Sequence, residues 1–237
     1  DFRRSRGLGD VYKRQTSEAF TCSMQIWASR KVEAWSSDIK NAFGQSMRTT
    51  RRQPLAASLP ADMNAAGFNL DPRQLLLCET EVYGLISGPS WLRQSLVATF
   101  EALGNRRNPY DKCIVMLPPA DSGDVVNAGH ALIEVDDIFE GGDKKHRSQM
   151  QKFYDKYKCG KCKKLIDLGD EGTLISGIRV KQHKDFTFTW HMDEYIQNSL
   201  KLVDVPRGYL SKTTMIDEWV MSQVVSCNGK IGWLGGN

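Results

Sequence analysis

One stretch, Ile133–Phe139, constrains the fold more than any other part of the sequence. It reads Ile-Glu-Val-Asp-Asp-Ile-Phe and is followed by Glu140-Gly141-Gly142. Apolar, β-favouring residues on both sides of the acids predict a half-buried strand that turns at Asp136 and Asp137. Crowded carboxylates in such a setting cost free energy unless a cation offsets their charge. Mg²⁺ prefers carboxylate and phosphate oxygens. The stretch therefore predicts a metal site for phosphoryl transfer, with a solvated turn as the alternative.

A second acid, Asp38, stands at the end of another predicted strand. Trp35-Ser-Ser-Asp38-Ile39 favours a short strand, and Asn41-Ala42-Phe43 begins a helix or turn. A carboxylate at a strand end can bind a ligand. Asp38 can equally cap the helix that follows, and this segment alone does not choose between the two interpretations.

Length and composition bound the remaining possibilities. A chain of 237 residues can form one large domain or two small ones. No run approaches the roughly 18 apolar residues of a membrane span, and no secretory signal opens the sequence. The six cysteines are scattered, which is typical of reduced thiols. We therefore expect a cytoplasmic or nuclear protein.

Positive charge is concentrated in two places. Residues 1–15 hold five basic and two acidic residues, and Asp10–Gln15 can be translated from GATGTGTATAAGAGACAG, which resembles a sequencing-library adaptor. We interpret 1–15 as a non-native segment and exclude it. From Lys144 to Lys164 there are nine Lys or Arg residues against one acid. This basic stripe is typical of a surface that meets phosphate backbones, although a solvated helix face is an equal alternative.

Periodicity predicts an alternation of helices and strands with one irregular insertion at about 46–80. Leu92, Leu96 and Phe100 mark one helix face, and Asp143 can cap a helix whose apolar face holds Met150, Phe153 and Tyr157. The predicted helices are 16–34, 91–100, 143–157 and 192–203. The predicted strands are 35–38, 113–117 and 131–139, with a hairpin formed by 174–180 and 186–190.

The order of these elements resembles the reverse transcriptases of copia-type retrotransposons. The resemblance runs from about residue 20 to the end of the chain. The matching blocks are SDIKNAF (37–43), EVYGLISGPSW (81–91), NPYDKC (108–113), IEVDDIFEGG (133–142), LISGIRVKQHKDFTFTWHMDEYIQ (174–197) and GKIGWLGG (229–236).

The resemblance implies an α+β fold: a palm, which is an antiparallel sheet backed by helices, with partial fingers and the start of a thumb. Residues 16–190 would form the palm and partial fingers, and 191–237 the truncated thumb. The implied activity is RNA-directed DNA polymerisation with two Mg²⁺ ions, Mn²⁺ being a substitute. The implied partners are an RNA or DNA template-primer, dNTPs, and the integrase and ribonuclease H domains of a longer Pol polyprotein. The implied location is a cytoplasmic virus-like particle or the nucleus.

The resemblance also implies residue roles. Asp38, Asp136 and Asp137 would be catalytic and bind metal, and Glu134 is a further candidate ligand. Nucleotide-binding positions would be Ile39 through its carbonyl, Phe43, Tyr83, Gly84, Ser87, Gly88 and Pro89. Phe43 could wall off the ribose 2′-hydroxyl or be a core residue. The expected nucleic-acid contacts are Lys144, Lys145, Arg147, Lys152 and Lys156.

Two departures leave the activity open. The family usually has Tyr at the position of Glu134 and often Gln near Ser87. Glu134 is expected on the same face as Asp136, where the two charges would repel. The alternatives to a polymerase are a non-catalytic remnant that at most binds nucleic acid, and a phosphohydrolase or nuclease that uses the same acids.

Overall fold

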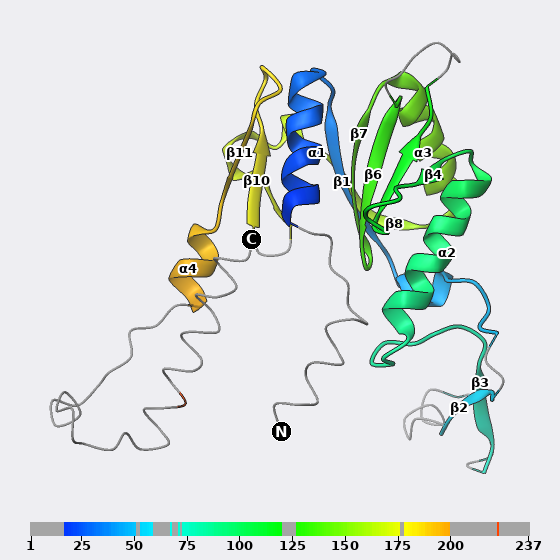
Figure 1. The fold of residues 1–237 in the computed structure, drawn as a ribbon. Helices are drawn as coiled ribbons and strands as arrows, with labels where there is room; N and C mark the ends of the chain where they lie inside the picture. The colour runs from blue at the N-terminus through cyan, green and yellow to red at the C-terminus, as the bar shows by residue number, and fades with distance from the viewer. Residues whose placement is uncertain are drawn as a thin grey trace, which may run out of the picture. The chain divides into compact units, whose positions relative to one another are not determined.

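A computed structural model describes residues 17–50, 53–58, 67, 71, 73–119, 127–175, 178–199 and 222 (Figure 1). The chain divides into two compact units. Unit 1 contains Trp35–Cys162, and unit 2 contains Thr16–Ala34 and Lys163–Asn237. The predicted adaptor-derived segment, 1–15, lies outside the described residues. The predicted palm-thumb boundary at 190/191 stays a prediction.

Unit 1 is built on a six-stranded sheet, counted over the described residues. Each pair with a determined register, β4 with β5, β5 with β6 and β6 with β7, is antiparallel. In sheet order the strands are β4 Arg106–Arg107, β5 Ile114–Leu117, β6 Gly129–Glu134, β7 Asp137–Gly142, β1 Ala34–Ile39 and β8 Cys159–Lys164. The predicted α+β class with antiparallel strands is confirmed.

Two helices pack on one face of this sheet (Figure 1). In α2, Gly88–Ala102, the predicted face of Leu92, Leu96 and Phe100 is buried. In α3, Lys144–Lys156, the Asp143 side chain accepts the His146 backbone N–H at 2.9 Å, which confirms the predicted cap. The rings of Phe100 and Phe153 stack at 4.3 Å between centroids and join the two helices.

The predicted irregular insertion contains a small hairpin. Strands β2, Leu55–Ser58, and β3, Leu75–Cys78, pair antiparallel in it. A short 3₁₀ helix, η1, Ala42–Gln45, follows β1. The residues between the two strands are described only at Gly67, Asp71, Arg73 and Gln74.

Unit 2 combines helix α1, Ser17–Ser29, with a three-stranded antiparallel sheet among its described residues. Its strands are β9 Thr173–Ile175, β10 Ile178–Gln182 and β11 Phe188–His191, and two 3₁₀ turns, η2 Leu165–Asp167 and η3 Gly169–Glu171, precede them. Gln182 accepts the Ala34 N–H at 2.9 Å and donates to the Val32 carbonyl at 2.8 Å. This double contact ties the segment after α1 to the sheet.

The predicted hairpin of 174–180 with 186–190 is confirmed only for the second part of 174–180. Ile175 pairs with Ile178, so 174–180 is itself two strands, and β11 pairs with the second of them. The predicted helix 192–203 is observed as α4, Asp193–Ser199. The rest of the predicted thumb, except Ser222, lies outside the described residues.

Candidate functional site

The acidic stretch forms the tight turn between β6 and β7. Glu134 pairs directly with Asp137, which leaves Val135 and Asp136 as the two turn residues. The prediction of a strand that turns at its acids is confirmed. The turn sets Glu134 opposite Asp137. That Glu134 shares a face with Asp136 stays a prediction, because Asp136 lies in the turn itself. Like charges directly opposite across a hairpin are destabilising.

Val135 takes a backbone φ of 54°. A β-branched residue rarely adopts this left-handed conformation, because its branched side chain crowds the backbone there. Such conformations cost about 1–3 kcal/mol and persist only where the surrounding structure enforces them. The turn that carries the acids is therefore held in an unfavourable conformation.

Asp38 reaches the same place from β1, which lies between β7 and β8. The Ile39 N–H donates to the Asp136 carbonyl at 2.9 Å, so the end of β1 is joined directly to the turn. On the other side, the Lys40 N–H donates to the Lys158 carbonyl at 3.0 Å. A Cβ built at Gly160 would lie 2.7 Å from Asp38 Oδ2, so a side chain at this position would collide with the carboxylate.

Strand alternation places three of the acids on one face of the sheet. Ile39, Ile133 and Ile138 lie in the core under the two helices. Because successive side chains point to opposite faces, their neighbours Asp38, Glu134 and Asp137 lie on the face away from α2 and α3. Asp136 lies at the turn between them. The four predicted metal-binding acids are thus brought to one end of the sheet.

The charges at this site influence each other. Reduced hydration is the largest cause that raises the pKa of Asp137 to about 6, and the charges of Asp136, Asp38 and Glu134 add to it in that order. The Asp137 side chain keeps access to solvent, so screening weakens these interactions. The excess negative charge is the kind of field that a divalent cation relieves.

The carboxylates are hard oxygen donors, which suits Mg²⁺. Within the described ranges, however, no three Asp, Glu, His or Cys side chains are placed closely enough to form a metal-binding group. The donor chemistry and the charge fit the ion, whereas a closed coordination shell is not formed.

Tyr83 and Phe43 lie beside the acids. Partial burial, then the charges of Asp136 and Asp38, raise the pKa of Tyr83. Its ring meets that of Phe43 edge-on, with 4.4 Å between centroids. Phe43 is only 5% exposed and belongs to the core, while Tyr83 is 62% exposed. The described contacts of Phe43 are those of a core residue, and its role at a ribose stays a prediction.

The other predicted nucleotide-binding residues lead into α2. Gly84 has a φ of 89°, Gly88 and Pro89 open the helix, and a Cβ at Gly88 would lie 2.9 Å from the Phe43 ring. Ser87 donates to the Glu81 carboxylate at 2.9 Å. Glu81 is buried, and sequence reasoning missed it because nothing local marks a non-periodic acid as internal.

Gln45 is a second residue that sequence reasoning missed. Its amide accepts the Lys158 N–H at 2.8 Å and donates to the Lys158 carbonyl at 3.1 Å, imitating a strand. This contact holds the start of β8 beside the end of β1. No local signal in the sequence pairs positions more than a hundred residues apart.

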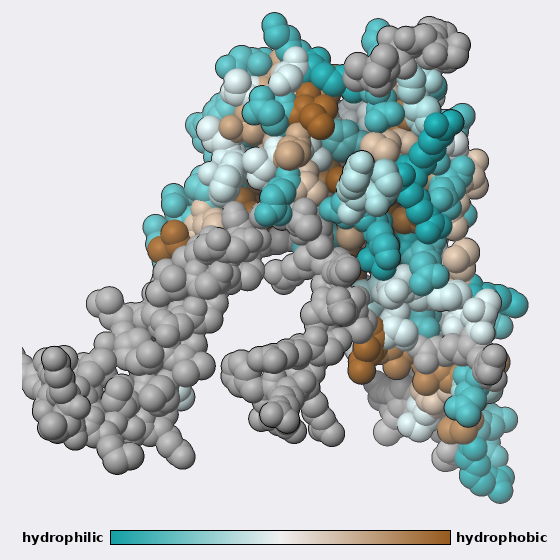
Figure 2. Space-filling view, in the orientation of Figure 1, coloured by the Kyte–Doolittle hydropathy of each residue, from teal (hydrophilic) through white to brown (hydrophobic). Residues whose placement is uncertain are grey.

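Apolar side chains are exposed near this end of unit 1. Figure 2 shows hydrophobic surface over β3 and the segment that leads into α2. The residues are Leu75, Leu77, Tyr83 and Ile86, each at least 62% exposed.

The five predicted nucleic-acid contacts are distributed along α3. The Lys145 ammonium donates to the Pro118 and Pro119 carbonyls, and that of Lys156 donates to Thr99 Oγ1 at 2.8 Å. Arg147 pairs with buried Glu140. Lys144 and Lys152 are exposed. Lys144 and Lys145 follow the far end of β7, roughly 20 Å from the turn for six residues of strand.

Comparisons with protein-family models, curated proteins and solved structures found no match to this chain. The likeness to copia-type reverse transcriptases therefore rests on the sequence motifs. Among the described residues, none of the helices has the length and apolar character needed to cross a membrane.

Proposed function

We propose that this chain is part of a reverse transcriptase of the copia type, which transfers a nucleotidyl group from a dNTP to the hydroxyl of a primer paired with an RNA or DNA template, with pyrophosphate as the leaving group. The observation that carries the proposal is the junction of β1 with the β6–β7 turn. There Asp38, in β1, and Asp136, in the β6–β7 turn, are about a hundred residues apart in sequence, and the Ile39 N–H that follows Asp38 donates to the Asp136 carbonyl.

The proposal gives each residue of the site a separate role. Asp38 and Asp136 would hold two Mg²⁺ ions, Asp137 would support them, and the Ile39 carbonyl would be a further oxygen donor. The chemistry that such ions would supply is a lower pKa for the primer hydroxyl and neutralisation of charge on the attacking and leaving oxygens. Tyr83 offers an exposed ring against which a base or sugar can pack, and Gly84 leaves open space in which a ligand can approach the backbone. Gly88 makes room for the Phe43 ring.

The partners follow from the same proposal. The template-primer, the dNTPs and the integrase and ribonuclease H parts of a Pol polyprotein are those of the family that the motifs resemble. In this proposal the α+β fold is a palm with partial fingers. The proposed location is a virus-like particle in the cytoplasm, or the nucleus.

Primer extension on an RNA template with Mg²⁺ tests the proposal. The full chain should extend the primer, and Asp136→Asn should reduce the rate about 100-fold or more, because it removes a ligand to the ions. Asp155→Asn on α3 is the matched control, since it makes the same substitution at an exposed acid distant in sequence from the turn. Equal rates for wild type and Asp136→Asn would exclude Asp136 from the reaction and contradict the proposal.

One observation favours a second candidate, a non-catalytic remnant that binds nucleic acid. Glu134 stands directly opposite Asp137, where it adds a negative charge to the site. The remnant predicts salt-dependent binding of nucleic acid without extension of the primer. Glu134→Tyr, the residue usual in the family, separates the candidates: a polymerase impaired by the extra charge gains activity, whereas a remnant does not.

A further inference from the structure

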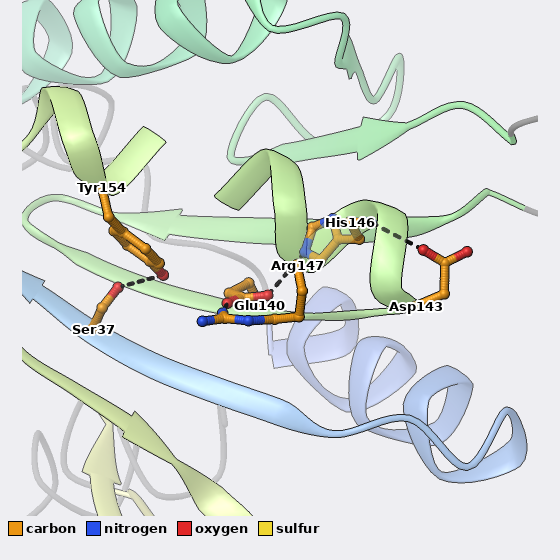
Figure 3. Close-up of polar contacts among 6 residues, drawn as sticks. All are labelled: Ser37, Glu140, Asp143, His146, Arg147 and Tyr154. Atoms are coloured by element: carbon orange, nitrogen blue, oxygen red, sulfur yellow. Dashed lines mark hydrogen bonds and ion pairs between the residues drawn. The ribbon is translucent and has the colours of Figure 1, made fainter. Parts of the chain in front are cut away.

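A buried ion-pair network lies under the acid-bearing strands, on the face that α3 covers (Figure 3). Glu140 in β7 is fully buried and contacts two residues of α3. His146 Nε2 lies 2.9 Å from Glu140 Oε2, and the Arg147 guanidinium pairs with the other carboxylate oxygen. A carboxylate buried this deeply is stable only with such partners.

Arg147 also reaches β1. Its guanidinium carbon lies 3.9 Å from the centroid of the Trp35 ring, a close cation–π contact. One side chain on α3 therefore contacts β7 through Glu140 and β1 through Trp35. The flat guanidinium can pair with a carboxylate and stack on a ring at once, which an ammonium cannot do.

A second contact runs parallel to the first. Ser37 Oγ and Tyr154 Oη lie 3.0 Å apart, again between β1 and α3 (Figure 3). Trp35 and Ser37 share the helix-covered face of β1, and Asp38 follows Ser37 on the opposite face. Asp137 lies three residues before Glu140 on β7. The network thus joins β1 and β7 on the face that α3 covers. Asp38 and Asp137 lie on the opposite face of the same two strands.

We propose that Arg147 is a positioning residue, which holds β1 against the β6–β7 hairpin and so keeps Asp38 beside the turn that carries Asp136. This rests on the proposed function above. In this proposal Arg147 makes contacts inside the fold, whereas the basic stripe predicts that it contacts nucleic acid. Outer residues that orient metal ligands typically change metal affinity by 10–100-fold.

Mn²⁺ titration of the full chain by calorimetry tests the proposal. Arg147→Met should weaken Mn²⁺ binding about tenfold. Because this variant leaves Glu140 buried without its cation, Glu140→Gln with Arg147→Met is the second variant, and it should show the same loss. Lys152→Met is the charge-matched control on the exposed side of α3, and Leu96→Ala is the stability-matched control in α2. Both controls should bind as wild type does.

Amide hydrogen exchange gives a readout that needs no metal. The Ile39 N–H donates to Asp136 across the junction, and the Ile133 N–H donates to Cys113 within the sheet. In Arg147→Met the exchange rate of Ile39 should rise about tenfold relative to Ile133. In Lys152→Met that ratio should not change.

The outcomes separate the two proposals. If wild type does not bind Mn²⁺, the proposed function fails. If wild type binds and both Arg147 variants bind equally well, the positioning role is wrong and the proposed function stands. Equal losses in Leu96→Ala would also overturn it, because affinity would then follow stability alone.

Discussion

Replacing Asp137 with Asn should stabilise the protein at neutral pH and change its stability much less in acid. The pKa of Asp137 is raised from 3.8 to about 6 in the folded chain, so the folded state keeps a proton that the unfolded chain has released. Stability then falls as pH rises from about 4 to about 6 and stays lower above that range.

The size of the effect follows from the shift. About two pKa units correspond to roughly 3 kcal/mol for a fully shielded group. The Asp137 side chain is exposed, so we discount this for solvent screening to on the order of 1 kcal/mol. Asn carries no charge and avoids the cost. The gain at about pH 7.5, relative to that at about pH 4.5, should therefore be about 1 kcal/mol.

Urea unfolding of wild type and Asp137→Asn at these two pH values measures the difference. Asp155→Asn, at an exposed position of α3, is the control for the substitution itself. Excess Mg²⁺ at the higher pH should narrow the gap between wild type and Asp137→Asn, since the cation offsets the charge. A gain that is equal at both pH values, or a larger gain in acid, would refute the reasoning.

Three further substitutions test the structural account through the free energy of unfolding. Val135→Gly should stabilise the protein by roughly 0.5–1 kcal/mol, because glycine accepts the φ of 54° without strain, whereas Val135→Ala should gain less; a loss of stability would contradict the strained turn. Leu96→Ala should cost about 2–5 kcal/mol, since the side chain is fully buried, and a change below about 1 kcal/mol would show that it does not pack in the core. Asp143→Ala should cost about 1 kcal/mol through loss of the cap on α3, whereas Asp143→Asn should keep most of the capping interaction and cost less. Equal costs for the two variants would argue against the cap.

Local patterns predicted the parts of the fold that local interactions decide. Leu92, Leu96 and Phe100 identify the buried face of α2 by spacing alone, and Asp143 stands just before an amphipathic run. The acidic turn was predictable for the same reason. The partner of Glu134 depends on register, which the local pattern does not fix: with two turn residues Glu134 faces Asp137, and with any other number it would not.

Contacts between residues that are distant in sequence could not be predicted from local patterns. The sequence pattern places Arg147 among the solvent-exposed cations of its helix. Its partners Glu140 and Trp35 lie on two different strands, and the pattern of the helix does not indicate them. The same holds for Gln45 with Lys158, which are more than a hundred residues apart. The meeting of Asp38 with Asp136 was predicted only through the ordered motifs of a known family, since strand order in a sheet leaves no local trace.

Calorimetric titration of Mn²⁺ into wild type, Asp38→Asn and Asp136→Asn tests the central claim most directly, because it asks whether acids from two distant segments form one cation site. The account predicts binding to wild type and a loss of about tenfold or more in each variant. Wild-type affinity in either variant, or no binding to wild type, would contradict it.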